Sequence, residues 1–370
     1  MTDDRPVPLD EYPVHQVPLS MKYVATGDRN AYDRCIFHVL DHEGRALLIL
    51  GLGVYPNLGV IDAYATLRLG DTLHAVRASD ALHDDSRTNL TVGPLRILVE
   101  RPLRDFVLSC EADPADPDGL SYEISWTAGF PALWEPHHLQ RRGGRLTLEG
   151  RRFVQAGHCE GWVRAGGREL RVQGWTGTRD RSWGVRPVPG EEGGRFAEEH
   201  PAEGFHWIWC PVRFEDRFLM VIVQEDADGH RSLNDATLVR PGHRDRQLGW
   251  PQPEITYRSG TRHPERALVH LGDVRKPMEL EVEILTSSPL ALGAGYPPAD
   301  DWQHGTWQGR DWTDRRTYDL SEPHPRAAFG VTDHAARFRL DGRTGHGIFE
   351  HGSFGRHDPS GFTGFDSVAP

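Results

Sequence analysis

A single aspartate flanked by arginines is the feature of this sequence that most clearly suggests chemistry. The segment Thr178–Arg186, TRDRSWGVR, places Asp180 between Arg179 and Arg181, with Trp183 just beyond. It follows a strand-like stretch, residues 170–175, in which apolar side chains alternate. Burying a carboxylate, guanidiniums and an indole at a strand end costs much desolvation free energy, so such a group predicts a functional site. An exposed turn with loose ion pairs is the alternative interpretation.

The protonation state of Asp180 decides which chemistry it can perform. Burial raises the pKa of a carboxyl group, whereas neighbouring guanidiniums such as Arg179 and Arg181 lower it. The sequence leaves both outcomes open. We expect Asp180 to act as a proton donor or base, with Arg181 setting its charge, or alternatively to anchor its loop through an arginine.

A second candidate lies in the alternating run Phe205–Trp209, FHWIW. In a strand, Phe205, Trp207 and Trp209 share one face, and His206 lies on the other with Ile208. The three aromatic side chains fit either a core or the wall of a pocket. His206 would then be free to complete an acid–base pair.

Glu350 and His351 form a further possible acid–base pair at the end of a strand-like stretch. Glycines flank them closely, which permits either close approach of a ligand or simply a turn. His206 or Glu350 is therefore our candidate partner for Asp180.

The elements that must position these residues are predominantly strands. Short apolar or alternating runs are bounded by Gly, Pro or Asp, and no stretch keeps a helical period over three turns. The 40 glycines and 27 prolines interrupt the chain too often for long helices. These patterns predict an all-β protein of antiparallel sandwich or barrel type with little helix. The clearest predicted strands are residues 45–50, 95–100, 106–110, 122–126, 218–223 and 280–285.

A polar, glycine-rich stretch after the Asp180 segment indicates a division into two domains of similar size. We expect an extension at 1–28, a first β domain at 29–189, a linker at 190–204, a second β domain at 205–355 and a tail at 356–370. The segment 289–325, which carries Trp302, Trp307 and Trp312, reads as a long loop. It would serve as a lid over a site or pack on the surface.

Charge and composition exclude several classes of protein. A net charge of −12 argues against nucleic-acid binding, because phosphate contacts require a basic surface. No apolar run reaches the ~20 residues that span a bilayer, and the acidic, proline-rich start does not resemble a secretory signal. We therefore expect a cytoplasmic protein with no integral membrane segment, whose four dispersed cysteines are free thiols. The oligomeric state is not predicted.

Several familiar motifs are missing. The sequence contains no dinucleotide fingerprint, phosphate-binding loop, nucleophile elbow or HExxH zinc motif. His137–His138 and His158 with Glu160 could ligate a metal, but with 20 histidines such pairs arise by chance. We expect neither a dedicated metal site nor a cofactor.

Three segments together resemble a known superfamily. Thr178–Arg186, GVYPNLGVID at 53–62 and GHGIFEHG at 345–352 are similar to motifs of the carotenoid 1,2-hydratase (hydroxyneurosporene synthase) superfamily, especially its two-domain lipocalin-like branch. The resemblance implies two lipocalin-like barrels packed side by side. It also implies that Asp180 protonates an alkene to give a tertiary carbocation, which water captures and which indoles such as Trp183 and Trp175 would stabilise.

Two departures from the superfamily pattern modify this expectation. Thr178 replaces the family's tyrosine and Arg181 replaces its histidine, which favours a carboxylate at Asp180 and hence a dehydration, an isomerisation or a lyase step. Further substrate contacts are expected from the three segments and from the aromatic strand. These candidate substrate-binding residues are Trp183, Trp175, Arg179, Trp207, Tyr55, Asp62 and His351.

The sequence thus predicts an acid–base enzyme, a hydratase, dehydratase, isomerase or cyclase, that needs no cofactor. Its substrate would be a hydrophobic small molecule: an isoprenoid, a steroid-like compound or an aromatic compound. The alternatives are a carrier that binds an apolar ligand without turnover, and metal-assisted hydrolysis through the histidines.

Overall fold

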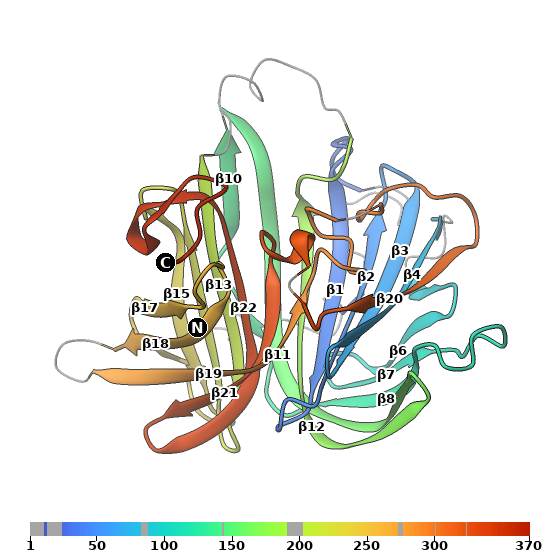
Figure 1. Cartoon of the computed structure of the whole chain (residues 1–370), viewed down its shortest axis with the longest axis horizontal. Coiled ribbons are helices and arrows are strands. Elements are labelled where there is room, and N and C mark those ends of the chain that lie inside the picture. The colour runs from blue at the N-terminus through green and yellow to red at the C-terminus, as the bar shows by residue number, and fades with distance from the viewer. Residues whose placement is uncertain are drawn as a thin grey trace.

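The computed structural model describes residues 11–12, 24–82, 88–142, 144–190, 203–272, 277–299, 301–322 and 324–370. Two curled antiparallel sheets stand side by side (Figure 1). The described residues contain no α-helix, and short 3₁₀ helices lie at Pro325–Ala327 and Asp358–Ser360. The prediction of an all-β protein with two lipocalin-like halves is therefore confirmed.

The first sheet has 13 strands and is built mainly from the N-terminal half of the chain. Along the sheet the order is β20-β4-β3-β2-β1-β12-β11-β8-β7-β6-β5, with β9 and β10 paired to β11. Its strands are β1 (Ala31–Leu40), β2 (Ala46–Tyr55), β3 (Val60–Leu69), β4 (Thr72–Ala81), β5 (Thr91–Val92), β6 (Leu95–Arg101), β7 (Asp105–Cys110), β8 (Ser121–Ala128), β9 (Leu133–Trp134), β10 (His138–Arg142), β11 (Arg145–Ala165), β12 (Arg168–Val185) and β20 (Trp312–Asp319).

The second sheet has 10 strands in the order β16-β15-β14-β13-β22-β21-β19-β18-β17, and β23 pairs with β22. Its strands are β13 (Gly204–Arg213), β14 (Phe218–Glu225), β15 (Arg231–Val239), β16 (Arg246–Gln247), β17 (Gln252–Tyr257), β18 (Pro264–Leu271), β19 (Met278–Pro289), β21 (Thr332–Leu340), β22 (Arg343–His357) and β23 (Phe362–Thr363).

Each sheet encloses its own apolar core, and a third apolar layer lies between the sheets. Strand β2, ALLILGLGVY, is buried along its whole length because both of its faces are covered. Leu48 and Leu50 pack inside the first sheet. Leu47 and Ile49 point the other way and pack with Trp207 and other side chains of the second sheet. The intermediate layer is therefore part of the hydrophobic core of the whole molecule.

The Asp180 segment lies inside a strand and not in a turn after one. Strand β12 continues without interruption through the segment to Val185, paired with β1 on one side and β11 on the other. Asp180 sits opposite Ile36 and Val154 in these two pairings. Hydrogen bonding on both sides fixes the backbone there, so the alternative of an exposed turn is wrong.

The expected domain boundaries remain a prediction, because the linker at 190–204 lies largely outside the described residues. One segment departs from a simple division. Strand β20 lies in the part of the chain expected to form the second domain, yet it pairs with β4 at the edge of the first sheet. The two sheets are thus joined by a strand exchange as well as by the apolar layer.

The predicted loop at 289–325 is only partly irregular. It contains β20, and its Trp302 is fully buried in the layer between the sheets. Trp307, by contrast, is half exposed. The tail expected at 356–370 is also ordered in part, since it completes β22 and supplies β23. Within the described residues, no helix has the length and apolar character needed to cross a membrane.

Candidate active site between the two sheets

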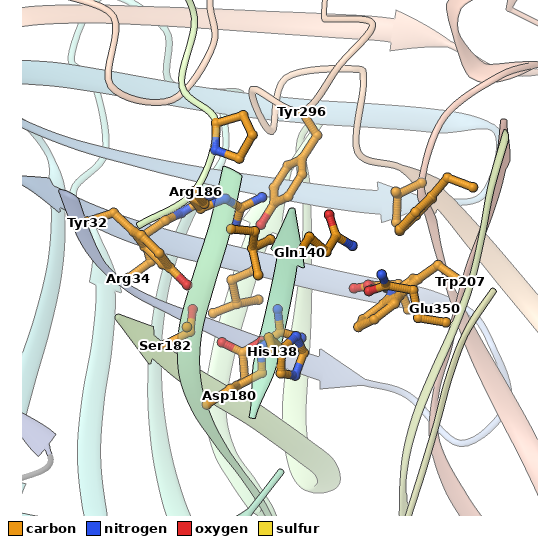
Figure 2. A pocket seen from close by; sticks show the side chains of 18 of the residues that line it. Tyr32, Arg34, His138, Gln140, Asp180, Ser182, Arg186, Trp207, Tyr296 and Glu350 are labelled. Atoms are coloured by element: carbon orange, nitrogen blue, oxygen red, sulfur yellow. Dashed lines mark hydrogen bonds and ion pairs between the residues drawn. The ribbon is translucent and has the colours of Figure 1, made fainter. Parts of the chain in front are cut away.

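A cavity of about 340 Å³ opens in the layer between the sheets (Figure 2). Its wall combines apolar and aromatic side chains with several charged groups, which is the usual composition of a small-molecule site. Strands of both sheets contribute, together with the segment that follows β19. The charged and aromatic side chains that line it include Tyr32, Arg34, His138, Arg151, Arg152, Asp180, Arg186, Phe205, Trp207, Tyr296, Glu350 and Phe354.

Asp180 reaches this cavity because β12 alternates its side chains between two faces. The Arg152 guanidinium of β11 lies nearest among the cations, with Nε 3.7 Å from the Asp180 carboxylate. Burial nevertheless raises the pKa of Asp180 above its ordinary value, by more than Arg152 lowers it. The desolvation effect therefore outweighs the cationic one, and Asp180 holds a proton more readily than an exposed aspartate does.

Arg181, the expected cationic neighbour, lies on the opposite face of β12. Its guanidinium pairs with Asp33 at 2.8 Å inside the first sheet. The expectation that Arg181 sets the charge of Asp180 is therefore wrong, because adjacent residues of a strand point in opposite directions. The cation beside Asp180 comes from the neighbouring strand instead.

Arg152 is shared with a second acid, Glu135. Its Nε lies 3.7 Å from the Glu135 carboxylate as well. Glu135 also accepts hydrogen bonds from Trp209 Nε1 at 2.6 Å and shares one with His138 Nε2 at 2.9 Å. Burial would raise the pKa of Glu135, but Arg152, His138 and Trp209 together lower it. Glu135 therefore carries the negative charge that balances Arg152, which leaves Asp180 less strongly held as a carboxylate.

Glu350 supplies the second titratable group in the cavity wall. The indole Nε1 of Trp207 donates a hydrogen bond to its carboxyl oxygen. Burial and the neighbouring carboxyl of Asp333 raise the pKa of Glu350 well above its ordinary value. Burial raises the pKa of Asp333 to about 7, against a hydrogen bond to Glu350 that lowers it. Two buried acids in contact behave as one coupled unit that retains a proton near neutral pH.

A histidine, His38, contacts this acid pair through Asp333. His38 Nε2 lies 3.0 Å from the Asp333 carboxyl group, and the Thr178 hydroxyl lies 3.1 Å from His38 Nδ1. Burial lowers the pKa of His38 to about 4, so the ring is neutral at physiological pH. It can donate one hydrogen bond to Asp333 without adding a positive charge.

The opposite end of the cavity is cationic. Arg34 lies over the Tyr296 ring at 5.0 Å, and Arg186 lies over Tyr32 at 5.5 Å (Figure 2). Among the described residues, no carboxylate lies within ion-pair distance of either guanidinium, and the buried Nη2 of Arg34 has no hydrogen-bond partner. Buried charges are normally paired. Two unpaired guanidiniums beside a cavity therefore suit an anionic group on a ligand.

Of the residues singled out in the sequence, Asp180, Glu350 and Trp207 meet at this cavity. Trp175 instead belongs to the core of the first sheet. Arg179 is fully buried in the same core, where it pairs with Glu11 at 2.7 Å. These two side chains hold the sheet together and do not line the cavity.

Trp183 and the early-motif residues also lie outside the cavity wall. Trp183 contacts the rings of Trp134 and Phe153 on the opposite face of β12. Tyr55 is buried in a small hydrophobic cluster with Tyr32, Val60 and Val188. Asp62 accepts hydrogen bonds from the amide of Gly305 at 2.7 Å and pairs with the ring of His304 at 3.1 Å. Asp62 thus anchors the segment that carries Tyr296.

His206 and His351 face the interior of the second sheet. Their rings contact each other at 5.2 Å, edge to face. The predicted division of β13 into an aromatic face and a histidine face is confirmed, because Trp207 and Trp209 belong to the layer between the sheets and Ile208 to the second core. His206 therefore cannot pair with Asp180.

Five residues of the site and its surroundings were not predicted from the sequence: Glu135, Arg152, Asp333, Arg34 and His38. Each is a single polar residue in an otherwise ordinary strand or turn. Only Glu135 could have been suspected from its neighbours in the sequence, because it lies three residues before His138. The others become recognisable only when the strand pairing brings them to one cavity.

Comparison with known proteins supports the fold and identifies a family. The structure resembles that of a protein assigned as an AttH from Nitrosomonas europaea, with a TM-score of 0.56 and 14% identity over 92% of this chain and 98% of that one. It resembles CghA solved with Sch210972, with a TM-score of 0.50 and 12% identity over 96% of each chain. Kievitone hydratase from Nectria haematococca aligns with a TM-score of 0.49 and 11% identity over 92% of this chain and 94% of that one.

At such low identities these likenesses concern the fold alone. No curated protein matches the sequence. The model of a family of unknown function, DUF8625, matches residues 7–363. The chain belongs to this family.

Proposed function

We propose that this protein is an acid–base enzyme that eliminates or adds water, or shifts a double bond, in a hydrophobic small molecule bearing an anionic or carbonyl oxygen. The observation that carries the proposal is a carboxyl group, Asp180, whose burial raises its pKa and which faces a partly apolar cavity. A general acid is most effective when its pKa approaches the working pH. The three segments that resemble motifs of the carotenoid 1,2-hydratase superfamily support the same class of chemistry.

The charges around the cavity favour an anionic intermediate over a carbocation. Arg34, Arg152 and Arg186 all line the cavity. The indole of Trp207, the aromatic group nearest the acids, already faces the Arg152 guanidinium at 5.6 Å. A developing positive charge would be repelled by these guanidiniums, whereas an enolate or phenolate oxygen would be stabilised by them. This differs from the alkene protonation that the resemblance implies.

In the dehydration direction, the ionised Glu350–Asp333 pair removes a proton from the carbon next to a carbonyl group. The electron pair of that C–H bond moves into the carbonyl, and the oxygen charge is held at the Arg34–Arg186 end. The enolate then re-forms the carbonyl and a carbon–carbon double bond, and the C–O bond to the hydroxyl breaks. Asp180 donates its proton to that hydroxyl, which leaves as water. The Glu350–Asp333 pair gains a proton and Asp180 loses one. Proton exchange with solvent then restores both to their starting states.

The test compares the wild-type protein with Asp180→Asn and with Asp235→Asn, a matched control. Burial also raises the pKa of Asp235, but it lies outside the cavity wall. Each protein is incubated with a hydrophobic extract of the native host in oxygen-18 water and, separately, in D₂O. Untargeted mass spectrometry then follows gain of labelled water, loss of water and deuterium incorporation.

The proposal predicts a product or a deuterated compound with wild type and Asp235→Asn but not with Asp180→Asn. If all three proteins retain the same unmodified compound, the protein is a carrier and the catalytic proposal is wrong. If all three convert the compound equally, Asp180 is not the acid.

A further inference from the structure

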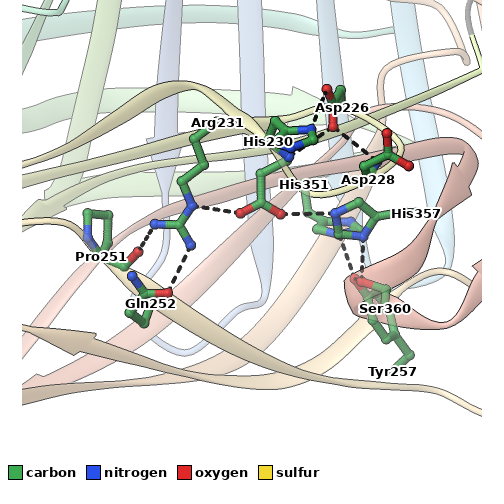
Figure 3. Close-up of polar contacts among 11 residues, drawn as sticks. Asp226, Asp228, His230, Arg231, Pro251, Gln252, Tyr257, His351, His357 and Ser360 are labelled. Carbon is green, nitrogen blue, oxygen red and sulfur yellow. Dashed lines mark hydrogen bonds and ion pairs between the residues drawn. The ribbon is translucent and has the colours of Figure 1, made fainter.

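A second cluster of titratable side chains lies inside the second sheet, away from the catalytic cavity. It is formed by His206 of β13, Glu225 of β14 and His357 of β22, all buried. One ligand atom from each residue lies within 4.8 Å of the others. The cluster borders a cavity of about 1080 Å³ that Tyr257 and Ser360 also line. Figure 3 shows the surroundings of His357.

Neighbouring side chains hold two members of the cluster in a defined orientation. The Nδ1 atom of His357 lies 2.8 Å from the Ser360 hydroxyl, so its Nε2 atom faces the Glu225 carboxylate at 2.9 Å. Arg231 Nε donates to the other oxygen of Glu225 at 2.8 Å (Figure 3). Such outer contacts are typical of metal ligands, whose free ring nitrogen and carboxylate they orient.

The third member is an unpartnered ring. His206 is 2% exposed, and its Nδ1 atom is buried without a hydrogen-bond partner among the described residues. Its ring stacks on that of His357 with centroids 4.1 Å apart. Burial and the neighbouring histidines lower the pKa of His206 well below its ordinary value, so the ring is neutral and retains a free lone pair. A buried polar group without a partner is costly unless something binds it.

We propose that His206, Glu225 and His357 bind one divalent transition-metal ion of the Zn²⁺ class. Two imidazole nitrogens and one carboxylate oxygen form a donor set typical of zinc, whereas Mg²⁺ and Ca²⁺ prefer oxygen ligands alone. The ion would take the place of the hydrogen bond between His357 and Glu225, with the His357 proton on Nδ1 and directed to the Ser360 hydroxyl, and would also engage His206. The proposal departs from our expectation of no dedicated metal site, and it is independent of the proposed chemistry at Asp180.

The independence follows from the geometry of the strands. On β13, His206 points into the second sheet while Trp207 points to the catalytic cavity. On β22, His357 lines the cavity inside the second sheet and Glu350 lines the catalytic one. The proposed ion would therefore lie on the far side of the β13–β22 pair from Asp180.

The experiment measures Zn²⁺ binding to full-length protein freed of metal with a chelator. Isothermal titration gives the stoichiometry and the dissociation constant, and Co²⁺ in place of Zn²⁺ reports nitrogen coordination by visible absorption. The variants are His206→Ala, the more conservative His206→Asn and Glu225→Gln. The control is His230→Ala, which alters the exposed cluster of Asp226, Asp228 and His230. Thermal unfolding of each metal-free variant confirms that it folds.

The proposal predicts one equivalent of Zn²⁺ in wild type, in His230→Ala and in Asp180→Asn. Both His206 variants and Glu225→Gln should bind at least ~100-fold more weakly. Binding lost in His230→Ala but kept in folded His206→Asn would overturn it. So would the absence of a saturable Zn²⁺ site in wild type.

Discussion

Two interiors of this molecule are built from adjacent residues of the same strands, yet they favour different chemistry. Toward the layer between the sheets, β13 and β22 present Trp207 and Glu350. Toward the interior of the second sheet, they present His206 and His351. Burial favours the neutral form in both places, raising the pKa of Glu350 and lowering those of the histidines. The Glu350–Asp333 pair therefore keeps one proton and leaves one carboxylate to accept another, whereas a neutral imidazole offers a lone pair.

Strand alternation, more than distance, separates the two sites. A single residue step changes which interior a side chain enters. The same rule explains why Arg181 is irrelevant to Asp180 and why Arg152 is not. Substitutions on one face should therefore alter one site and leave the other unchanged.

The largest effect is expected from Asp180→Asn. The amide cannot donate a carboxylic proton, so turnover of the compound found in the host extract should fall by about 10²–10⁴-fold, the usual contribution of a general acid. Zn²⁺ affinity should not change. Steady-state kinetics on the variant checks the prediction, and activity within threefold of wild type would refute the role of Asp180.

The second prediction concerns the pH dependence of stability. The pKa of Asp333 is raised to about 7 in the folded state, against an ordinary value near 3.8. Between these values the native state binds more protons than the unfolded state, so this group makes stability fall as pH rises from about 4 to 7. At ~1.4 kcal/mol per pKa unit, the contribution is on the order of 4 kcal/mol.

Asp333→Asn should remove the contribution of Asp333 to the fall in the free energy of unfolding between pH 4 and 7. The amide oxygen can still accept the hydrogen bond from His38. Urea unfolding at pH 4.5 and 7.5 measures the difference in the free energy of unfolding for each protein. Equal pH slopes in wild type and variant would mean that Asp333 has an ordinary pKa. Asp319→Asn, at an exposed site, is the control.

A smaller effect is expected at the cationic end of the cavity. Arg34→Met keeps the length of the side chain but removes its charge. A charged hydrogen bond contributes about 1.5–3 kcal/mol, so binding of 1-naphthoic acid should weaken by ~10–100-fold. Binding of its neutral methyl ester should change little. Tryptophan fluorescence titration with both probes gives the comparison, and equal losses for acid and ester would contradict an anion site.

The smallest predicted effect separates the two acids that share Arg152. Glu135→Gln removes the negative charge that balances Arg152, so the cation should then stabilise the Asp180 carboxylate more strongly. The pKa of Asp180 should therefore fall, because Glu135 raises it in the wild-type protein, and the alkaline limb of the pH–rate profile should move to lower pH. A profile unchanged in position, with only its height reduced, would show that Glu135 acts through structure alone.

The sequence predicts the fold class, the faces of β13 and three of the cavity residues because these follow from local alternation. It cannot predict the charged neighbours of Asp180, because Arg152 and Asp333 reach the cavity only through the pairing of distant strands. The same limitation explains why Trp175 and Trp183 were wrongly predicted to bind substrate. Their indoles point into the first sheet and away from the cavity. Strand β20 was missed because its alternation, WTDRRTYD, contains few apolar residues.

The most direct test of the central claim is the pKa of Asp180 itself. Carbon-13 labelling of the aspartate carboxyl groups, followed by NMR titration of wild type and Asp180→Asn, identifies its resonance by difference. We expect this resonance to titrate above the ordinary aspartate pKa of about 3.9. A carboxyl group that titrates at or below that value would be a carboxylate at neutral pH, and Asp180 could not be the proton donor.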